Sequence, residues 1–575
     1  MSLTYENEPV QPPTPLKWYP DSLAWQITVR KEVIRKEPSF KKFQNFLVCE
    51  SEAGNISRQE AVSMIPPLFL DLHPHHKVVD LCAAPGSKTA QILEALNVTG
   101  IEQEGSGGLV IANDMDNKRC YTMIHQLNRS PSAMYMATCY DASHFPNLRI
   151  SGQDGNDEIL KFDRVLADVP CSGDGTLRKN ESIWKLWTNK SGMGLHPLQI
   201  RILYRGLQML AVNGRLVYST CSLNPLENEA VVAEVLRRTQ GVVEVIDVSD
   251  ELPDLIRRPG MQSWKVFDSN NEEMEPSDFV KGGRITETMF PPTSEEEDIK
   301  RQLSRCIRIY PHLQDTGGFF IAVLKKSAPL TGAKAPEPKD TATNGTKYST
   351  SSHVSDSRSE QNESPSTPTE STPTEEPAAK PLTKPQPYLA KEEPFVYLPS
   401  DHPDLLQIRS FYNLSPTFPT STFFVRNATG EPLHAIYITN PLVKNLIHRN
   451  PTLRLLNAGT RLFQKQADPK SGAEMSWRMH ADGLSLIDPF LGEERVVETV
   501  VEELKELLKD GELFPLIKSL SEGVRKQIEV LKPGGFVIRV KPGESKEVQV
   551  PFSIPMWRSG QSVKYHCLCM DRVDF

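Results

Sequence analysis

Six short apolar segments, separated by stretches of helical length, constrain the fold of the first 326 residues more than any other feature. Few polar residues interrupt them, as is typical of strands buried on both faces of a sheet. Such strands alternating with helices favour an α/β fold with a mostly parallel sheet. The last segment follows Gly317-Gly318 and lies far from the fifth, so we expect it to return as an antiparallel strand. The six segments are 77–81, 108–113, 133–138, 162–168, 214–219 and 317–324.

A segment rich in proline, serine, threonine and glutamate divides the chain of 575 residues. It holds much of the excess of the 46 prolines and few large apolar residues. Such a composition does not bury enough apolar surface to offset the entropy cost of ordering. We therefore expect an α/β domain over 15–326, a disordered linker over 327–392 and a small α+β or barrel-like module over 393–575. In that module, strands are expected at 421–425, 434–439 and 535–540, and a helix at 497–509.

Charge and cysteine content exclude several classes of protein. The 65 lysines and arginines against 73 aspartates and glutamates give a net charge of −8, which excludes a histone-like protein but not a local basic patch. No apolar run approaches the ~18 residues of a membrane span, and no signal-peptide core is present, so we expect a soluble intracellular protein with no membrane partner. The nine cysteines are scattered along the chain without partners at zinc-ligand spacing, so no metal is expected.

Small and acidic residues follow the first three strands, at the edge where parallel sheets bind ligands. The loop DLCAAPGSKT at 80–89 contains Gly86, which lets a ligand approach the backbone where a helix begins, and lacks Walker and dinucleotide glycine spacings. Asp114 after the second strand is placed to accept ribose hydroxyls, and Asp141 follows the third. Either aspartate alone is commonly a helix cap. Together these loops predict a nucleoside cofactor without phosphates, which S-adenosylmethionine fits best.

Two cysteines follow the fourth and fifth strands, one in each loop. Cys171 lies in the loop that begins with Asp168, and Cys221 lies in the next, so both thiols should enter the crevice. Carbon 5 of cytosine accepts a methyl group only after a thiolate has added to carbon 6. A carboxyl group at ring nitrogen 3 stabilises that adduct. The residue pattern supplies these groups but does not decide which cysteine is the nucleophile.

Several long motifs within 15–326 resemble those of the Sun-domain RNA (cytosine-5-)methyltransferase family. DLCAAPGSKT resembles its cofactor motif, DVPCSGDGTLRK its target-base motif and STCSLNPLENE its nucleophile motif, while 54–68 and 312–324 resemble flanking motifs. The resemblance is strongest to the eukaryotic tRNA-methylating branch, which also has a low-complexity linker and a carboxy-terminal module. It implies a Rossmann-like, seven-stranded sheet and S-adenosylmethionine-dependent methylation of cytosine carbon 5 in tRNA, with other RNAs as further substrates.

The resemblance also implies roles for individual residues. Cys221 matches the nucleophile, Cys171 the cysteine that assists adduct release, and Asp168 the acid shared by base and cofactor. Asp114 matches the ribose contact and Asp141 the adenine contact. The cofactor loop comprises Cys82, Ala83, Ala84, Pro85, Gly86, Ser87 and Lys88.

Beyond the site, the resemblance implies a nuclear and nucleolar location with a cytoplasmic pool, and we expect a monomer. Members of this branch usually begin well upstream of the segment matching 15–20, with an additional RNA-contacting region, whereas this chain starts at Met1. We therefore expect a shortened isoform or incomplete gene model with reduced RNA affinity and an intact catalytic core.

Local basic groups are the expected RNA contacts of a chain with net negative charge. The first group follows the Cys171 loop, interleaved with Trp184 and Trp187, and comprises Arg178, Lys179, Lys185 and Lys190. The second lies within 444–478, where Phe463 and Trp477 are interleaved and two acids, Asp468 and Glu474, intervene; an ordinary solvated face accounts for it equally well. Its basic residues are Lys444, Arg449, Arg454, Arg461, Lys465, Lys470 and Arg478.

Two other functions stay open from the sequence. An exocyclic-amine RNA methyltransferase would use the turn at Asp168, but such enzymes carry two prolines and an aromatic residue where this chain has Val169 and Cys171. A non-catalytic RNA-binding scaffold is the second alternative, and the intact cysteine pair argues against it. Mass spectrometry of the methylated base separates the first alternative, and methyl transfer to bulk tRNA the second.

Overall fold

A computed structural model describes most of the chain, and residues 1–331 and 393–575 form one compact unit. From position 331 onward, the linker expected over 327–392 lies outside the described residues. No helix in the described part is long and apolar enough to cross a membrane. The described residues are 4–5, 8–29, 31–96, 107–152, 154–278, 283–330, 393–466, 475–508, 515–541 and 551–565.

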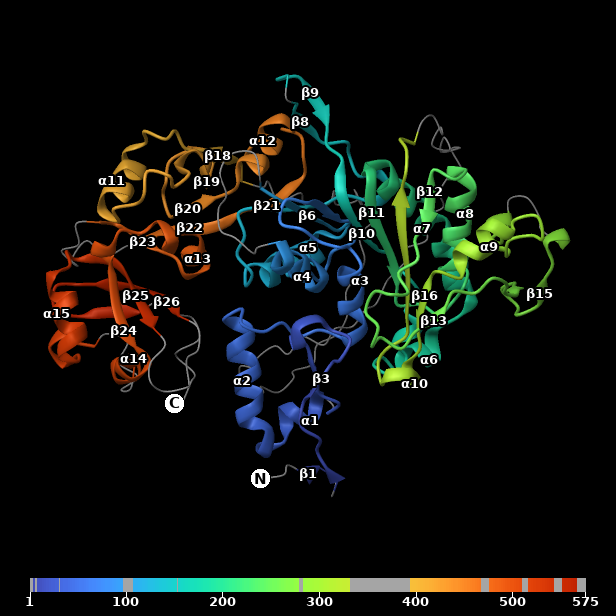
Figure 1. The fold of residues 1–575 in the computed structure, drawn as a ribbon, viewed down its shortest axis with the longest axis horizontal. Helices are drawn as coiled ribbons and strands as arrows, with labels where there is room; N and C mark the ends of the chain where they lie inside the picture. The colour runs from blue at the N-terminus through green and yellow to red at the C-terminus, as the bar shows by residue number, and fades with distance from the viewer. Residues whose placement is uncertain are drawn as a thin grey trace, which may run out of the picture. The chain divides into compact units, whose positions relative to one another are not determined.

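A ten-stranded sheet forms the centre of the unit, in the order β13-β16-β17-β11-β10-β5-β6-β7-β21, with β12 paired to β17 (Figure 1). The run from β16 to β7 contains the seven strands expected, and β12, β13 and β21 enlarge it. Adjacent strands from β11 to β7 pair in parallel, whereas β17 is antiparallel to β11, as predicted. The strands are β5 (Lys77–Asp80), β6 (Leu109–Asn113), β7 (Tyr135–Thr138), β10 (Phe162–Asp168), β11 (Leu210–Thr220), β12 (Val243–Val245), β13 (Arg258–Pro259), β16 (Ile307–Ile309), β17 (Phe319–Lys326) and β21 (Leu455–Ala458).

Helices cover both faces of this sheet, which explains why its strands are nearly continuous apolar runs. Alternate residues of one strand enter opposite cores: Val79 packs in the core that includes Leu207, and Val78 packs in the core that includes Leu93. The first core lies under α7 and α8, and the second under α4 and α5. The helices are α4 (Ser87–Leu96), α5 (Asn117–Leu127), α7 (Asn189–Met209) and α8 (Glu229–Thr239). Smaller flanking helices are α2 (Lys41–Glu52), α3 (Ile65–Leu68), α6 (Ser182–Leu186), α9 (Glu297–Leu303) and α10 (Pro311–Gln314).

The carboxy-terminal half contains a five-stranded and a four-stranded sheet. The three strands expected from the sequence are present as β19, β20 and β25. The helix expected at 497–509 is wrong at its start, because β-branched residues from Val496 form a strand paired with β25 before α14 begins at Val501. The strands are β18 (Phe395–Tyr397), β19 (Phe423–Arg426), β20 (Ala435–Ile438), β22 (Thr460–Lys465), β23 (Trp477–Met479), β24 (Val496–Val500), β25 (Gly534–Lys541), β26 (Phe552–Arg558) and β27 (Val563–Tyr565). The main helices are α11 (Pro403–Phe411), α12 (Pro441–Arg449), α14 (Val501–Leu508) and α15 (Glu522–Val530).

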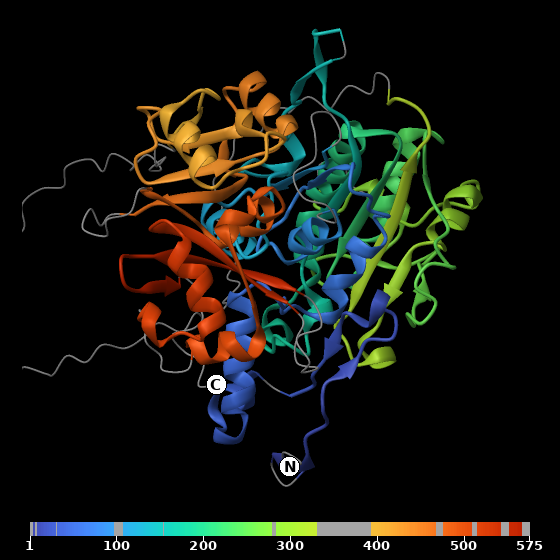
Figure 2. The same cartoon turned by 60° about the vertical axis from the view of Figure 1, so that its left-hand side comes forward.

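One strand of the carboxy-terminal half completes the central sheet, which the sequence did not predict. β21 pairs antiparallel with β7 at the sheet edge, and α12 lies beside the hairpin β8 (Arg149–Ser151)–β9 (Asp157–Ile159) (Figures 1 and 2). Asn440 caps α12 and donates its Nδ2 to the carbonyl of Gly108 at 2.8 Å. Asn450 accepts from the Arg149 amide and donates to its carbonyl, both at 2.9 Å. Residues 440–458 therefore belong to the same packed body as the catalytic crevice.

Candidate active site

The cofactor loop joins the end of β5 to the start of α4. Gly86 has a φ of +105°, and a Cβ there would approach the Met123 side chain at 3.2 Å, so a larger residue would strain this turn. Beneath the loop, Thr89 donates its hydroxyl to the buried Asp80 carboxyl at 2.8 Å. Burial raises the pKa of Asp80 to about 7. The loop is thus a compact turn with backbone groups next to a helix start, as a small polar ligand requires.

The acidic side chains after β6 and β7 differ in their surroundings. Asp114 is buried and accepts hydrogen bonds from the amides of Ala84 at 3.2 Å and Asp116 at 3.1 Å, and burial raises its pKa. Arg119 lies 3.4 Å from the Asp114 carboxylate and donates to the Ala84 carbonyl at 2.6 Å. Asp141 accepts from the Ser143 amide at 2.9 Å, so it caps a short helix. Asp114 therefore links two loops of the cofactor side, whereas Asp141 shapes the third.

Asn113, which the sequence reasoning missed, connects these loops from below. Its Oδ1 accepts from the Thr138 hydroxyl and the Tyr140 amide, both at 3.0 Å. Its Nδ2 donates to the carbonyls of Leu81 at 3.0 Å and Tyr140 at 2.9 Å. A fully buried asparagine at a strand end was the available sequence signal. With Asp114 and the free polar edge of the loop, this arrangement fits the hydroxyls and base of an adenosine-containing cofactor.

Asp168 lies between the cofactor loop and the cysteines. Its carboxylate accepts from Lys88 Nζ at 2.7 Å and from the Ser219 hydroxyl at 2.7 Å. Burial alone would lower the pKa of Lys88, but the charge of Asp168 raises it above its usual value. Lys88 therefore stays protonated and holds Asp168 as a carboxylate facing both parts of the site.

Cys171 and Cys221 are in contact, with their sulfur atoms 3.3 Å apart. Both are free thiols, and they come from the loops after β10 and β11. The hydrogen bond with Cys221 and burial raise the pKa of Cys171 well above the usual value. The pair is therefore unequal, because Cys171 retains a proton that it donates to the sulfur of Cys221. This asymmetry favours Cys221 as the thiolate, a choice that the residue pattern left open.

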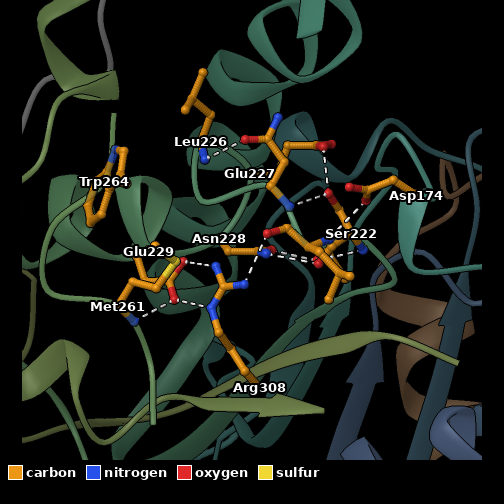
Figure 3. Close-up of polar contacts among 12 residues, drawn as sticks. Asp174, Ser222, Leu226, Glu227, Asn228, Glu229, Met261, Trp264 and Arg308 are labelled. Atoms are coloured by element: carbon orange, nitrogen blue, oxygen red, sulfur yellow. Dashed lines mark hydrogen bonds and ion pairs between the residues drawn. The ribbon is translucent and has the colours of Figure 1, made fainter. Parts of the chain in front are cut away.

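Behind the cysteines lies a buried polar network that the sequence reasoning did not identify (Figure 3). Glu227 accepts hydrogen bonds from both cysteine loops, through Ser172 and Ser222. Two residues further on, the carboxylate of Glu229 accepts two hydrogen bonds from Arg308, each 2.6 Å long, and both side chains are buried. The letters ENE at the end of the nucleophile motif were the visible signal for both acids.

The first basic group only partly faces solvent. Arg178 pairs with Asp315 at 2.6 Å, and Lys179 lies 3.2 Å from Glu60. Lys185 and Lys190 are exposed. Beside them, 73% of Trp184 and 41% of Trp187 are exposed, together with Leu186. The structure thus places two lysines and two tryptophans on a surface that directly follows the Cys171 loop in the chain.

The second basic group does not present its aromatic rings. Phe463 and Trp477 are fully buried in the core of the five-stranded sheet, so their expected place on an RNA-facing surface is wrong. They alternate with basic residues because β22 and β23 place successive side chains on opposite faces. Arg449 pairs with Asp157 of the β8–β9 hairpin. Lys470, Asp468 and Glu474 lie outside the described residues.

Comparison with known proteins identifies three matching segments. A family model described as 16S rRNA methyltransferase RsmB/F matches residues 67–325. Models described as the NSUN2 pre-PUA domain and the NSUN2 PUA domain match residues 394–492 and 495–573.

Relatives match nearly the whole chain. A Schizosaccharomyces pombe protein named multisite-specific tRNA:(cytosine-C(5))-methyltransferase trm4b is 42% identical, over 98% of this chain and 84% of its own. A Saccharomyces cerevisiae protein named multisite-specific tRNA:(cytosine-C(5))-methyltransferase is 41% identical, over 98% and 78%. A Drosophila melanogaster tRNA (cytosine(34)-C(5))-methyltransferase is 37% identical, over 92% and 71%. With the paired cysteines and the cofactor loop at one sheet edge, these matches show that the chain belongs to the RsmB/F family of RNA cytosine-C5 methyltransferases.

Proposed function

We propose that this protein methylates carbon 5 of cytosines at several positions in tRNA, with S-adenosylmethionine as the methyl donor. The observation that carries the proposal is the contact of Cys171 and Cys221 at 3.3 Å beside Asp168, which Lys88 connects to the cofactor loop. A nucleophile, a second thiol and a carboxylate are thereby placed in one crevice. The relatives named for tRNA cytosine methylation match 98% of the chain, which supports tRNA as the substrate.

The cofactor is assigned to the loop from Cys82 to Lys88, with Asp114 at the ribose and Asp141 near the adenine. When bound there, it supplies an electrophilic methyl group. Asp114 has the geometry of a hydroxyl acceptor, because two backbone amides and Arg119 hold its carboxylate in place. Asp168 faces both the methyl donor and the target base, and a carboxylate there accepts hydrogen bonds from the polar edge of the ring.

The two thiols divide the covalent chemistry between them. The Cys221 thiolate adds to carbon 6, which forms a carbon–sulfur bond and makes carbon 5 nucleophilic. Once this sulfur is a neutral thioether, it no longer accepts a hydrogen bond that holds the proton on Cys171. Cys171 then loses its proton to solvent and, as a thiolate, takes the proton from methylated carbon 5. The double bond between carbons 5 and 6 re-forms, and Cys221 leaves as a thiolate.

RNA contact near the cysteines is assigned to Lys185 and Lys190 for phosphates and to Trp184 and Trp187 for bases. Arg178 and Lys179 flank this surface, already paired with acids. Neutralising Lys185 and Lys190 should lower the salt dependence of tRNA binding by about two phosphates. Trp184→Ala should instead weaken binding about tenfold without changing the salt slope, because stacking carries no charge. Unchanged affinity in both variants would remove this surface from the RNA interface.

The wider assignments rest on the family resemblance. Residues 15–326 form the catalytic part, and 393–575 form a part that binds RNA, as the match to a PUA domain supports. We also propose a monomer in the nucleus and nucleolus, with a cytoplasmic pool. Sedimentation of the purified chain and imaging of a tagged full-length chain test these two assignments.

Incubation of the purified chain with labelled S-adenosylmethionine and unmodified tRNA transcripts tests the function. Mass spectrometry should detect 5-methylcytosine, and bisulfite sequencing should map it to several positions. Methyl groups on the exocyclic amine would establish the exocyclic-amine alternative instead. Binding of cofactor and tRNA without transfer would establish the scaffold.

A further inference from the structure

We propose that Glu227 is a positioning residue that sets the distance between Cys171 and Cys221 by binding both cysteine loops at once. This inference rests on the proposed function, because it concerns the same two thiols. The relevant loops are not covalently linked, and the paired register of β10 and β11 ends at Asp168 and Ser219, before either cysteine. A sulfur–sulfur contact of 3.3 Å therefore needs a further connection between the loops.

The Glu227 carboxylate provides that connection. Its Oε1 accepts from the Ser172 amide at 2.8 Å and from Gln199 Nε2 at 3.1 Å. Its Oε2 accepts from the Ser172 hydroxyl at 2.5 Å and the Ser222 hydroxyl at 2.8 Å. Ser172 follows Cys171 and Ser222 follows Cys221, so one side chain grips the residue next to each thiol.

The backbone of Glu227 is itself held rigidly. The Tyr218 hydroxyl donates to the Glu227 carbonyl at 2.6 Å, and Asn228 accepts from Thr220 at 2.6 Å and donates to the Ser222 carbonyl at 2.9 Å. The Arg308 side chain, paired with Glu229, also donates to the Leu223 carbonyl at 3.0 Å (Figure 3). Because this frame anchors the segment on both sides, movement of Glu227 would be transmitted directly to the serines.

The chemistry of the donors makes Glu227 unusual. All four donors are neutral, whereas its neighbour Glu229 is matched by the cation Arg308. Burial of a carboxylate with neutral partners is costly, and burial raises the pKa of Glu227. A group that acts by geometry should tolerate an uncharged substitute of the same shape. Glutamine has that shape, and both serine hydroxyls can rotate to accept from its amide.

Glu227→Gln and Glu227→Ala form the central test, with adduct formation on RNA containing 5-fluorocytidine as the readout. Fluorine at carbon 5 is not removed as a proton is, so the adduct persists. We expect Glu227→Ala to lower the rate of adduct formation about 100-fold, as a displacement of about 1 Å does. Glu227→Gln should stay within about tenfold of the wild-type rate, and the KM for tRNA and the cofactor affinity should change less than about twofold in both.

Smaller cuts guard against a misfolded Glu227→Ala. Ser172→Ala and Ser222→Ala each remove one arm of the bridge and should lower the rate less than Glu227→Ala; in the Glu227→Ala background their effects should vanish. Gln302→Ala is the matched control, because it removes a buried side chain that binds the Val245 amide in another part of the fold. It should lower the melting temperature without lowering the rate of adduct formation in the folded protein.

Two outcomes would overturn the proposal. A wild-type rate in Glu227→Ala would show that the loops keep their spacing without the bridge. Equal losses in Glu227→Gln and Glu227→Ala would show that the negative charge acts in the chemistry, so positioning would be the wrong role. In either case the wild-type chain still forms the adduct and 5-methylcytosine, whereas failure of the wild-type chain to form them would refute the proposed function itself.

Discussion

The cysteine side and the cofactor side of the crevice are built in different ways. On the cysteine side, the loops after β10 and β11 are tied by side chains close to them in the chain, such as Ser172, Ser222 and Glu227. On the cofactor side, the loop after β7 rests on the carboxy-terminal half, because Cys139 donates to the Arg454 carbonyl at 3.2 Å and Arg454 donates to the Tyr140 hydroxyl at 2.6 Å. The covalent chemistry is thus locally encoded, whereas cofactor binding is coupled to the half of the chain that matches the PUA models.

The largest expected effect is on the cysteine side. Cys221→Ala should lower methyl transfer by about 10³-fold or more, because no thiolate then adds to carbon 6. Transfer of labelled methyl groups to tRNA measures this, and calorimetry should find the cofactor affinity unchanged. An RNA adduct through Cys171 in this variant would reverse the roles of the two cysteines.

Cys171→Ala should stop the reaction at a later point. We expect a covalent protein–RNA complex that survives a denaturing gel, because Cys221 adds to the ring but no thiol takes the carbon 5 proton. The complex should be absent from the Cys171→Ala, Cys221→Ala double variant. Turnover at the wild-type rate without a complex would remove Cys171 from adduct release.

A pH-dependent loss of stability is expected from the support of the cysteine side. His196 is buried, with Nδ1 2.6 Å from the Leu226 carbonyl and Nε2 2.8 Å from the Thr288 hydroxyl, and burial lowers its pKa to about 4. The unfolded chain therefore binds more protons between pH 6.5 and 4, and stability present above this window is lost as the pH falls through it. The loss at pH 5 relative to pH 7 should be about 2 kcal/mol from this group.

Urea unfolding of the wild type and His196→Gln at both pH values isolates that contribution, since the buried His76 titrates in the same window. The variant should lose about 2 kcal/mol less than the wild type between pH 7 and 5. Equal losses in the two proteins would show that other groups carry the acid sensitivity.

On the cofactor side, Gly459→Ala should weaken cofactor binding about tenfold. Gly459 follows β21, has a φ of +59° and donates to the Tyr135 carbonyl at 2.9 Å, and an added Cβ would lie only 2.0 Å from the Ile438 carbonyl oxygen. Displacement of this residue should loosen the β7 edge and the loop that follows it.

Gly430→Ala is the matched control, because Gly430 has a similar φ of +75° and an added Cβ would meet only the Val396 side chain. Both variants should lose stability, but only Gly459→Ala should lose cofactor affinity in calorimetry. Equal cofactor affinity in the two variants would show that the cofactor side does not depend on β21.

The smallest effect is expected from Tyr140→Phe. This variant removes the oxygen that accepts the Arg454 amide, but the contact is exposed and water can replace it. Cofactor affinity should therefore fall about two- to fivefold. A larger loss would indicate that the Tyr140 hydroxyl also contacts the cofactor, and rescue by no change in ionic strength would fit a neutral hydrogen bond.

The sequence by itself determined the elements that depend on local pattern. Continuous apolar segments identified the central strands because helices cover both faces of the sheet. Since parallel strands end at one edge, the residues after them, from the cofactor loop to Cys171 and Cys221, were predicted as one site before any contact was known. The strand at Val496 was misread as part of a helix, because a short apolar run suits either structure until its pairing partner is known.

Only the tertiary structure decided the features that depend on distant partners. Pairing of β21 with β7 joins backbone groups more than 300 positions apart, and edge pairing leaves no side-chain signature in the sequence. Phe463 and Trp477 looked like RNA-stacking residues until folding placed them in a core. Glu227 became a bridge only because Ser172 and Ser222 converge on it, and the proton asymmetry of the two cysteines arises only when their sulfur atoms meet, since both effects require contact.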